Sequence, residues 1–184
     1  MPSRCAAAKG GRAPAGPTDL SALLAPALAG ADVGLISEAG LPAVADPGAA
    51  LVAAAHRLGI VVQPLAGPSA LMLALAASGL NGQSFAFVGY LPTDAAARTA
   101  RVQALQQQSR RERQTQIVIE TPYRNAALMA ALLEAMQPDT LLAVACGLTL
   151  PGGWCVTRSV AQWRAQPAAF ADKHLPAVFL WLAA

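Results

Sequence analysis

Short apolar runs alternate with longer runs of helical spacing along most of the chain. The runs Asp32–Ser37 and Ile60–Leu65 are short and contain β-branched residues, so we expect each to form a buried strand. The spacing predicts helices from after Thr18 to Gly30, from Asp46-Pro47 to Gly59, and over the segment SALMLALAASG. Alternation of strands and helices in this order predicts parallel strands.

The alternation of predicted strands and helices continues through the second half of the chain. The predicted strands are Ser84–Tyr90, Thr115–Glu120, Leu141–Cys146 and the final run AVFLWL. The predicted helices are about Asp94–Ser109, about Asn125–Met136 and a short one around Ala161, and a hairpin-like turn is expected at Pro151-Gly152-Gly153. The pattern of the whole chain is typical of the α/β class.

The chain divides into three expected segments. Its 184 residues, 55% of them hydrophobic, are enough to bury a core. Residues 1–18 are basic, rich in Ala, Gly and Pro and without the apolar segment of a secretory signal, so we expect them to be disordered. An N-terminal α/β lobe is expected over 19–89 and a C-terminal α/β lobe over 90–184. No apolar run approaches the roughly 20 residues that cross a bilayer, which predicts a soluble protein. Because residues 1–18 lack the features of a secretory signal, we expect a cytoplasmic location.

Composition argues against several classes of chemistry. Cys5, Cys146 and Cys155 are odd in number and form no Cys-x-x-Cys pair, so we expect neither a disulfide framework nor a metal site. The sequence carries no phosphate-loop, dinucleotide-binding, zinc-protease or α/β-hydrolase motif. The net charge of +3 is compatible with an anionic partner without identifying one.

Loops that follow predicted strands are the candidate ligand sites, because ligands of α/β sheets bind beyond the carboxyl ends of the strands. In the first loop, Ser37 to Pro42, Gly40 permits close approach to the backbone, and a structural turn explains the same residues equally well. In the second loop, Pro68-Ser69-Ala70 opens a helix whose N-terminus suits a carboxylate, although Ser69 is also an ordinary N-cap residue.

The third loop follows the predicted strand that ends at Glu120. It places a carboxylate on Glu120, a phenol on Tyr123 and a guanidinium on Arg124 at one strand terminus. Thr121 and Asn125 in the same loop also suit the cap of the next helix. The sequence is compatible both with a catalytic role for this loop and with a structural role as the cap of the next helix.

Five segments in register carry a resemblance to a known family. They are GLISEAGLPAVADPG, PLAGPSALMLALAASGL, FVGYLP, IETPYR and AVACGLT. From about Asp19 to the C-terminus the chain resembles the tetrapyrrole-methylase superfamily, and within it the branch that methylates ribose 2′-hydroxyls of 16S ribosomal RNA.

The resemblance implies a class III methyltransferase fold of two α/β lobes, with S-adenosylmethionine in the cleft between them. It also implies a homodimer and ribosomal RNA as the substrate. The residues that it assigns to the cofactor are Ser37, Ala39, Gly40, Leu41, Pro42, Val44, Pro68, Ser69, Ala70, Thr121, Gly147, Leu148, Pro176 and Ala177.

Methyl transfer to a ribose hydroxyl benefits from a base, and Glu120 is the first candidate, with Tyr123 and Arg124 orienting the acceptor or its phosphate. A structural ion pair between Glu120 and Arg124 is the equally weighted alternative. The candidate contacts to RNA phosphates are Arg98, Arg101, Arg110, Arg111 and Arg113. A solvated charged face explains these arginines as well.

The sequence also departs from the family pattern. The first strand and its G-T-P-I-G-type loop are missing before Asp19, and Glu38, Leu41, Tyr123 and Cys146-Gly147 replace typical residues. Two other functions therefore stay open. One is a methyltransferase for a tetrapyrrole or another small molecule, and the other is a truncated, non-catalytic family member that acts as a binding or dimer partner.

Overall fold

The computed structural model describes residues 20–166, 168, 170 and 174–184, so the expected disorder of residues 1–18 lies outside the described part. The chain forms two compact units, Met1–Ser69 (unit 1) and Ala70–Ala184 (unit 2). The division after Ser69 differs from the predicted lobe boundary near Gly89. The reason is that the segment between them supplies a helix and a strand that pack into the sheet of unit 2.

Unit 1 contains two short helices that pack on each other, α1 (Leu20–Leu28) and α2 (Ala49–Arg57). Their contact buries Leu24, Ala54 and Ala55. Helix α1 was predicted in this place. Helix α2 begins later than expected, because Gly48, with a φ of 136°, is its N-cap residue and Asp46-Pro47 precedes it.

The two strands predicted for unit 1 are wrong. Residues 32–37 and 60–65 run without strand pairing in the described chain. Their apolar side chains are largely exposed, at 73% for Ile36, 91% for Val61 and 78% for Leu65. A strand is held by hydrogen bonds to a neighbouring strand, and the described residues of unit 1 supply none.

Unit 2 is built on one sheet whose strand order, in the described residues, is β1-β2-β5-β3-β4. The strands are β1 (Phe85–Gly89), β2 (Thr115–Glu120), β3 (Leu141–Cys146), β4 (Trp154–Ser159) and β5 (Ala177–Leu182). Strands β2, β3 and β5 have the predicted bounds, whereas β4 was not predicted. Only β1 and β2 run parallel, and the other three pairs are antiparallel, so the expectation of parallel strands is wrong for most of this sheet.

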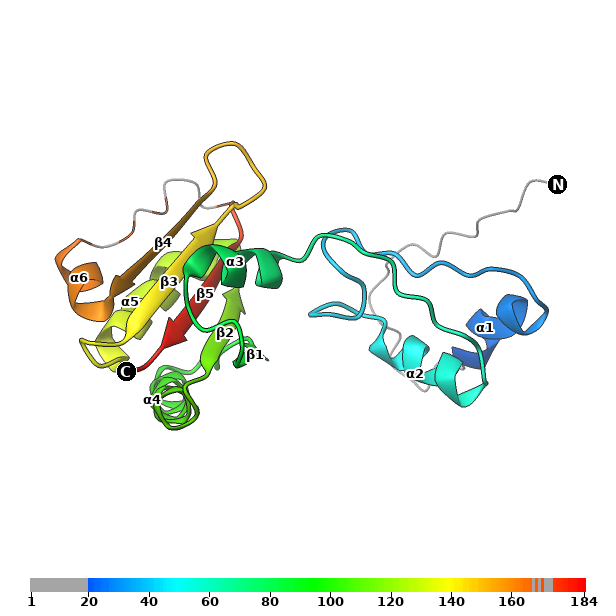
Figure 1. Ribbon diagram of the computed structural model, residues 1–184, viewed down its shortest axis with the longest axis horizontal. Helices are drawn as coiled ribbons and strands as arrows, with labels where there is room; N and C mark the ends of the chain where they lie inside the picture. Colours follow the sequence, from blue (N-terminus) through cyan, green and yellow to red (C-terminus); the bar gives the residue numbers. More distant parts are fainter. Residues whose placement is uncertain (1–19, 167, 169, 171–173) are drawn as a thin grey trace. The chain divides into compact units, whose positions relative to one another are not determined.

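Helices cover both faces of this sheet (Figure 1). Side chains alternate between the two faces along each strand, so each face has its own core. On one face, Phe179 and Trp181 of β5 pack with helices α4 (Ala95–Glu112), α5 (Asn125–Ala135) and α6 (Val160–Ala165). On the other face, Val178 and Leu180 of β5 pack against helix α3 (Ala70–Ser78), together with small side chains of β3. The apolar helix α3 and the helix α5 were both predicted from the sequence.

Local hydrogen bonds fix the ends of two helices in unit 2. The Asp94 carboxylate accepts a hydrogen bond of 2.8 Å from the Ala97 backbone N–H at the start of α4. Ser159 and Gln162 form a capping box at the start of α6. None of the helices in the described ranges is both long and apolar enough to cross a membrane.

Candidate active site

Three strands of unit 2 meet at one edge of the sheet. Strand β2 ends at Glu120 and β3 ends at Cys146, and both residues pair with Ala177, where the antiparallel β5 begins. The loops beyond these residues therefore lie together, and the Gly147 backbone N–H donates a hydrogen bond of 3.0 Å to the Pro176 carbonyl. This edge collects several residues predicted for the cofactor: Thr121, Gly147, Leu148, Pro176 and Ala177.

The backbone conformation at position 147 favours glycine, and a side chain there would make a tight contact. The φ of Gly147 is 58°, in the left-handed region, and a Cβ there would lie 3.2 Å from Cδ1 of Leu175. The chain then turns back, and the Leu150 N–H donates a hydrogen bond of 2.8 Å to the Gly147 carbonyl. A side chain at Gly153 would collide with that same carbonyl oxygen, at 2.0 Å. The loop after β3 is thus held close to the edge.

One buried acceptor at this edge has no partner among the described residues. Asn125, the first residue of α5, is 1% exposed, and its side-chain amide donates a hydrogen bond of 3.0 Å to the Leu175 carbonyl. Its Oδ1 atom accepts none. An unpartnered buried oxygen is costly unless a ligand or water donates to it. The sequence suggested only a cap for Asn125, so this feature was missed.

The first predicted ligand loop, in unit 1, is a series of tight turns. The Ser37 hydroxyl accepts a hydrogen bond of 3.2 Å from the Ala39 N–H and donates one of 2.7 Å to the Ala39 carbonyl. Gly40, Ala43 and Ala45 have φ values of 75°, 65° and 55°. Two alanines in the left-handed region are uncommon, and strained backbone of this kind concentrates at functional sites. The sequence reading did not single out Ala43 or Ala45.

The predicted cofactor residues are divided between the two units. Unit 1 holds Ser37, Ala39, Gly40, Leu41, Pro42, Val44, Pro68 and Ser69. Unit 2 holds Ala70, at the start of α3, and the five residues at the sheet edge. A cleft between two lobes that joins these sets stays a prediction.

The three candidate catalytic side chains in the loop after β2 lie in different environments. A single turn of 3-10 helix, η1 (Pro122–Arg124), follows Thr121. Tyr123 points into solvent and is 75% exposed. The Arg124 guanidinium lies 3.1 Å from the Glu120 carboxylate, and the side chains are 28% and 2% exposed. The structure therefore forms the ion pair that was the alternative to a base.

Both oxygens of Glu120 are engaged in this arrangement. Its Oε1 accepts hydrogen bonds of 2.8 Å from the Thr121 backbone N–H and 3.2 Å from the Thr121 hydroxyl, while Oε2 faces Arg124. These three contacts occupy most of the acceptor positions of the carboxylate. The role of Glu120 as a base stays a prediction.

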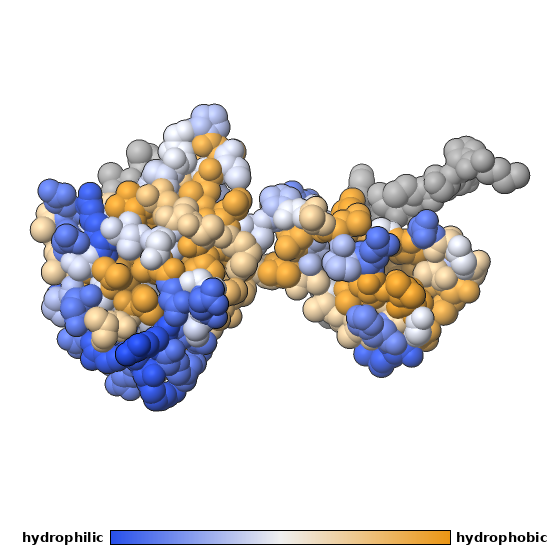
Figure 2. Space-filling model, viewed as in Figure 1, coloured by the Kyte–Doolittle hydropathy of each residue, from blue (hydrophilic) through white to orange (hydrophobic). Residues whose placement is uncertain are grey.

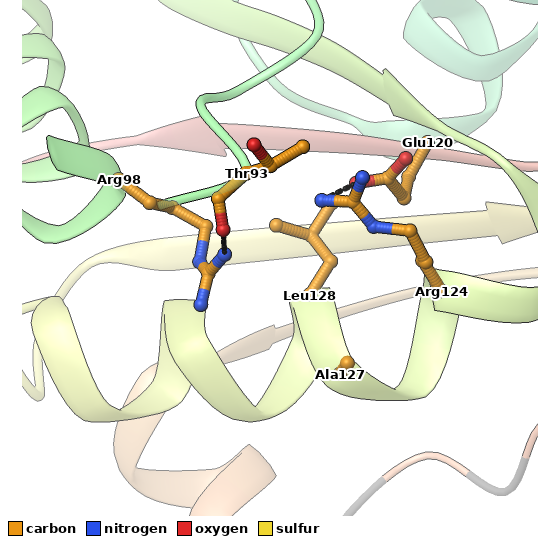
Figure 3. Close-up of a pocket in the computed structure, with 6 residues that line it drawn as sticks. All are labelled: Thr93, Arg98, Glu120, Arg124, Ala127 and Leu128. Carbon is orange, nitrogen blue, oxygen red and sulfur yellow. Dashed lines mark hydrogen bonds and ion pairs between the residues drawn. The ribbon is translucent and has the colours of Figure 1, made fainter. Parts of the chain in front are cut away.

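Glu120 and Arg124 form part of the wall of a cavity of about 150 Å³ in unit 2. Its lining residues are Thr93, Arg98, Glu120, Arg124, Ala127 and Leu128 (Figure 3). Arg98, from α4, donates hydrogen bonds to the carbonyls of Thr93, at 2.9 Å, and Pro92, at 3.5 Å. Of the five arginines predicted to contact RNA, Arg98 thus lies at this cavity, and Arg101 is exposed outside its lining.

The surface at α4 is hydrophilic (Figure 2), and Arg110, Arg111 and Arg113, at the end of this helix, are exposed. Arg110 lies 3.6 Å from Asp139, and Arg111 lies 2.6 Å from Glu112, whose pKa is lowered by hydrogen bonds from Arg111 and Gln108. Arg113 adopts the left-handed conformation that ends the helix. These contacts support the alternative of a solvated charged face for this end of α4.

The two cysteines in the described ranges, Cys146 and Cys155, form no disulfide, and no group of His, Cys, Asp and Glu there is arranged to hold a metal ion. Cys146 is buried at the end of β3, and Cys155 is half-buried on β4. Burial raises the pKa of the Cys155 thiol, which disfavours its reactive thiolate form.

Solved structures of two methyltransferases have a fold similar to that of this chain. The methyltransferase CobJ superposes with a TM-score of 0.58 at 19% identity, covering 90% of this chain and 70% of CobJ. Uroporphyrin-III-C-methyltransferase from Thermus thermophilus superposes with a TM-score of 0.52 at 22% identity, covering 95% of this chain and 74% of that one. At such identities the likeness concerns the fold alone.

Two proteins found by sequence comparison share a higher identity with this chain than these solved structures do. A ribosomal RNA small subunit methyltransferase I from Pseudomonas aeruginosa is 48% identical over 95 residues, which cover 52% of this chain and 32% of the relative. A protein of the same name from Mesorhizobium japonicum is 41% identical over 127 residues, or 69% of this chain and 42% of the relative. The matched segments thus span less than half the length of these two relatives.

The family model of the tetrapyrrole (corrin/porphyrin) methylases matches residues 12–160, which is most of the chain. This match includes the turns of unit 1, helix α3 and the loops after β2 and β3, where the candidate ligand residues lie. The chain belongs to the tetrapyrrole methylase family.

Proposed function

We propose that the protein is an S-adenosylmethionine-dependent methyltransferase that methylates a ribose 2′-hydroxyl in small-subunit ribosomal RNA. The observation that carries this proposal is the loop after β2. There the segment IETPYR, quoted above for its resemblance to the ribosomal RNA branch, brings Glu120 and Arg124 to the edge that also holds Gly147 and Pro176. The names of the relatives at 48% and 41% identity support the same acceptor.

The residues at this edge fit a nucleoside cofactor. Gly147 keeps the backbone open where a Cβ would press on Leu175, and Asn125 offers a buried oxygen to a hydrogen-bond donor such as an amino group. The cofactor supplies a methyl group on a positively charged sulfur. The part of the protein is to orient the acceptor and exclude water, which requires few chemically special side chains.

The acceptor side of the reaction is assigned to the loop after β2. Arg124 is held by Glu120 and orients the acceptor, and exposed Tyr123 is free to pack on a base or sugar. Exchange of the Glu120–Arg124 contact on substrate binding would free one carboxylate oxygen for the hydroxyl proton. A homodimer and a cytoplasmic location, where ribosomal RNA is found, belong to the same proposal.

Calorimetric titration of the folded chain with S-adenosylhomocysteine tests the cofactor part of the proposal. We expect stoichiometric binding to the wild type and binding at least tenfold weaker, or about 1.4 kcal/mol, for Gly147→Ala, because the new methyl group meets Leu175. Gly152→Ala is the matched control. Its φ of 79° is also left-handed, but a Cβ there meets nothing within 4 Å.

The acceptor is tested with methyl-labelled S-adenosylmethionine and purified small ribosomal subunits. We expect label in the RNA, on a ribose 2′-oxygen located by mass spectrometry of nuclease fragments. Label in a tetrapyrrole but not in RNA would replace the acceptor by a small molecule. Binding of S-adenosylhomocysteine without transfer to either acceptor would leave a non-catalytic family member.

A further inference from the structure

The cavity between α4 and the loop after β2 has an unbalanced charge. Its lining contains two guanidinium groups, on Arg98 and Arg124, and one carboxylate, on Glu120. The remaining lining residues, Thr93, Ala127 and Leu128, are uncharged. One positive charge is therefore left without a counter-charge in the cavity wall.

Of the two partners of the ion pair at the cavity wall, the arginine is the more exposed. The Glu120 side chain is 2% exposed and is tied down by Thr121, whereas the Arg124 side chain is 28% exposed. The only described contact of Arg124 with a charged group is the one between its Nη2 atom and Glu120. The rest of this planar fork of donors is available to a ligand.

Arg98 enters the same space from the other side. Figure 3 shows its guanidinium and that of Arg124 approaching from α4 and from η1, with Leu128 of α5 between them. Its Nη1 atom is fixed by the carbonyls of Pro92 and Thr93. Its Nε–H is buried and has no acceptor among the described residues. A buried charged donor without an acceptor is unfavourable, and an anionic oxygen would satisfy it.

We propose that this cavity is a phosphate subsite in which Arg98 and Arg124 together bind a backbone phosphodiester of the RNA acceptor. Two guanidinium forks around one space suit tetrahedral phosphate oxygens, with which arginine pairs in a bidentate manner. The phosphate bound here lies beside the loop that carries Glu120 and Tyr123, so it would set the register of the acceptor sugar. The identity of the ligand as RNA rests on the proposed function, whereas the phosphate chemistry follows from the two arginines.

The test measures binding of a short fluorescein-labelled single-stranded oligoribonucleotide to the full chain by anisotropy at several salt concentrations. We expect Arg98→Gln and Arg124→Gln each to weaken binding about tenfold and to reduce the slope of log affinity against log salt by about one ion. Arg57→Gln removes the same charge from an exposed position on α2 and is the control, with a change under about twofold. Arg98→Lys keeps the charge but loses the Nε–H, and we expect it to fall between the wild type and Arg98→Gln.

Two outcomes would overturn the subsite. The first is equal affinity in Arg98→Gln, Arg124→Gln and Arg57→Gln. The second is binding of inorganic phosphate that depends on the two arginines while the affinity for the oligonucleotide does not, which would assign the cavity to a free phosphate. An unchanged circular dichroism spectrum in each variant is the check that a loss of affinity does not come from damage to the fold.

Failure of the subsite and failure of the proposed function give different results. If the wild type binds the oligonucleotide through Arg98 and Arg124 but does not bind S-adenosylhomocysteine, the phosphate subsite is supported and the proposed methyltransferase activity is contradicted. If the wild type binds S-adenosylhomocysteine and neither arginine affects its affinity for RNA, the proposed cofactor site is supported and the phosphate subsite is contradicted.

Discussion

Glu120 illustrates how burial decides between two uses of one carboxylate. Its position at the end of β2 was readable from the sequence, because an apolar run ends there and polar residues follow. From the sequence, a role of Glu120 as a proton acceptor and a role in an ion pair with Arg124 were weighted equally. In the structure its side chain is 2% exposed and contacts Thr121 and Arg124. A carboxylate that leaves water needs such partners, which explains why the ion pair forms.

Ser109 is a second residue whose role depends on tertiary contacts. It is fully buried near the end of α4, donates a hydrogen bond of 2.7 Å to the Gln114 carbonyl and accepts one of 3.0 Å from the Ala183 N–H. We expect Ser109→Ala to lower the free energy of unfolding by about 1–3 kcal/mol, because two backbone groups lose their partner. Urea denaturation followed by circular dichroism measures this change.

Gln103→Ala, an exposed substitution on the same helix, is the control for Ser109→Ala and should change the free energy of unfolding by less than about 0.5 kcal/mol. If both variants unfold at the same urea concentration, the two hydrogen bonds of Ser109 contribute nothing to stability.

At the scale of elements, strand prediction succeeded where both faces of the strand are buried. Strands β2, β3 and β5 were predicted with their observed bounds, and alternate residues of each enter the two cores of unit 2. The segments 32–37 and 60–65 have similar apolar character, yet they form no strand in the described chain. The difference lies in the presence of a hydrogen-bonding neighbour, which a local pattern does not encode.

Hydrogen exchange distinguishes these two kinds of apolar segment. We expect the amides of 32–37 and 61–65 to exchange nearly as fast as an unfolded chain, because none of them has a hydrogen bond to a backbone carbonyl of a neighbouring strand in the described chain. Amides of β3, which is hydrogen-bonded on both sides to β4 and β5, should exchange orders of magnitude more slowly. Measurement by mass spectrometry on the full chain compares both within one sample. Equal protection in all three segments would show that 32–37 and 61–65 are paired in solution.

At the scale of the whole molecule, the buried apolar residues are distributed unevenly. Unit 2 contains two extended cores on the two faces of its sheet, whereas the described core of unit 1 consists of Leu24, Ala54 and Ala55 with a few partly buried neighbours. Hydrophobic burial is the main favourable term in folding. Most of the described stabilising burial therefore belongs to unit 2.

We expect a fragment of residues 70–184 to fold alone. Trp163 and Trp181 are almost fully buried in its core, so their fluorescence should be blue-shifted and should move to the red in urea in one cooperative step. A fragment of residues 1–69 should show no cooperative transition by circular dichroism, since its core is small. Emission from the 70–184 fragment that is the same with and without urea would contradict this expectation.

The sequence alone determined the family, the bounds of β2, β3 and β5, and the loops in which the candidate ligand residues lie. These features depend on short motifs and on the alternation of apolar positions, which are local properties of the chain. The order of the strands, their antiparallel pairing and the meeting of Arg98 with Arg124 around one cavity were decided by the tertiary structure. Pairing between strands and contacts between helices join residues that are distant in sequence, and the free energy of such contacts depends on the whole fold rather than on any one segment.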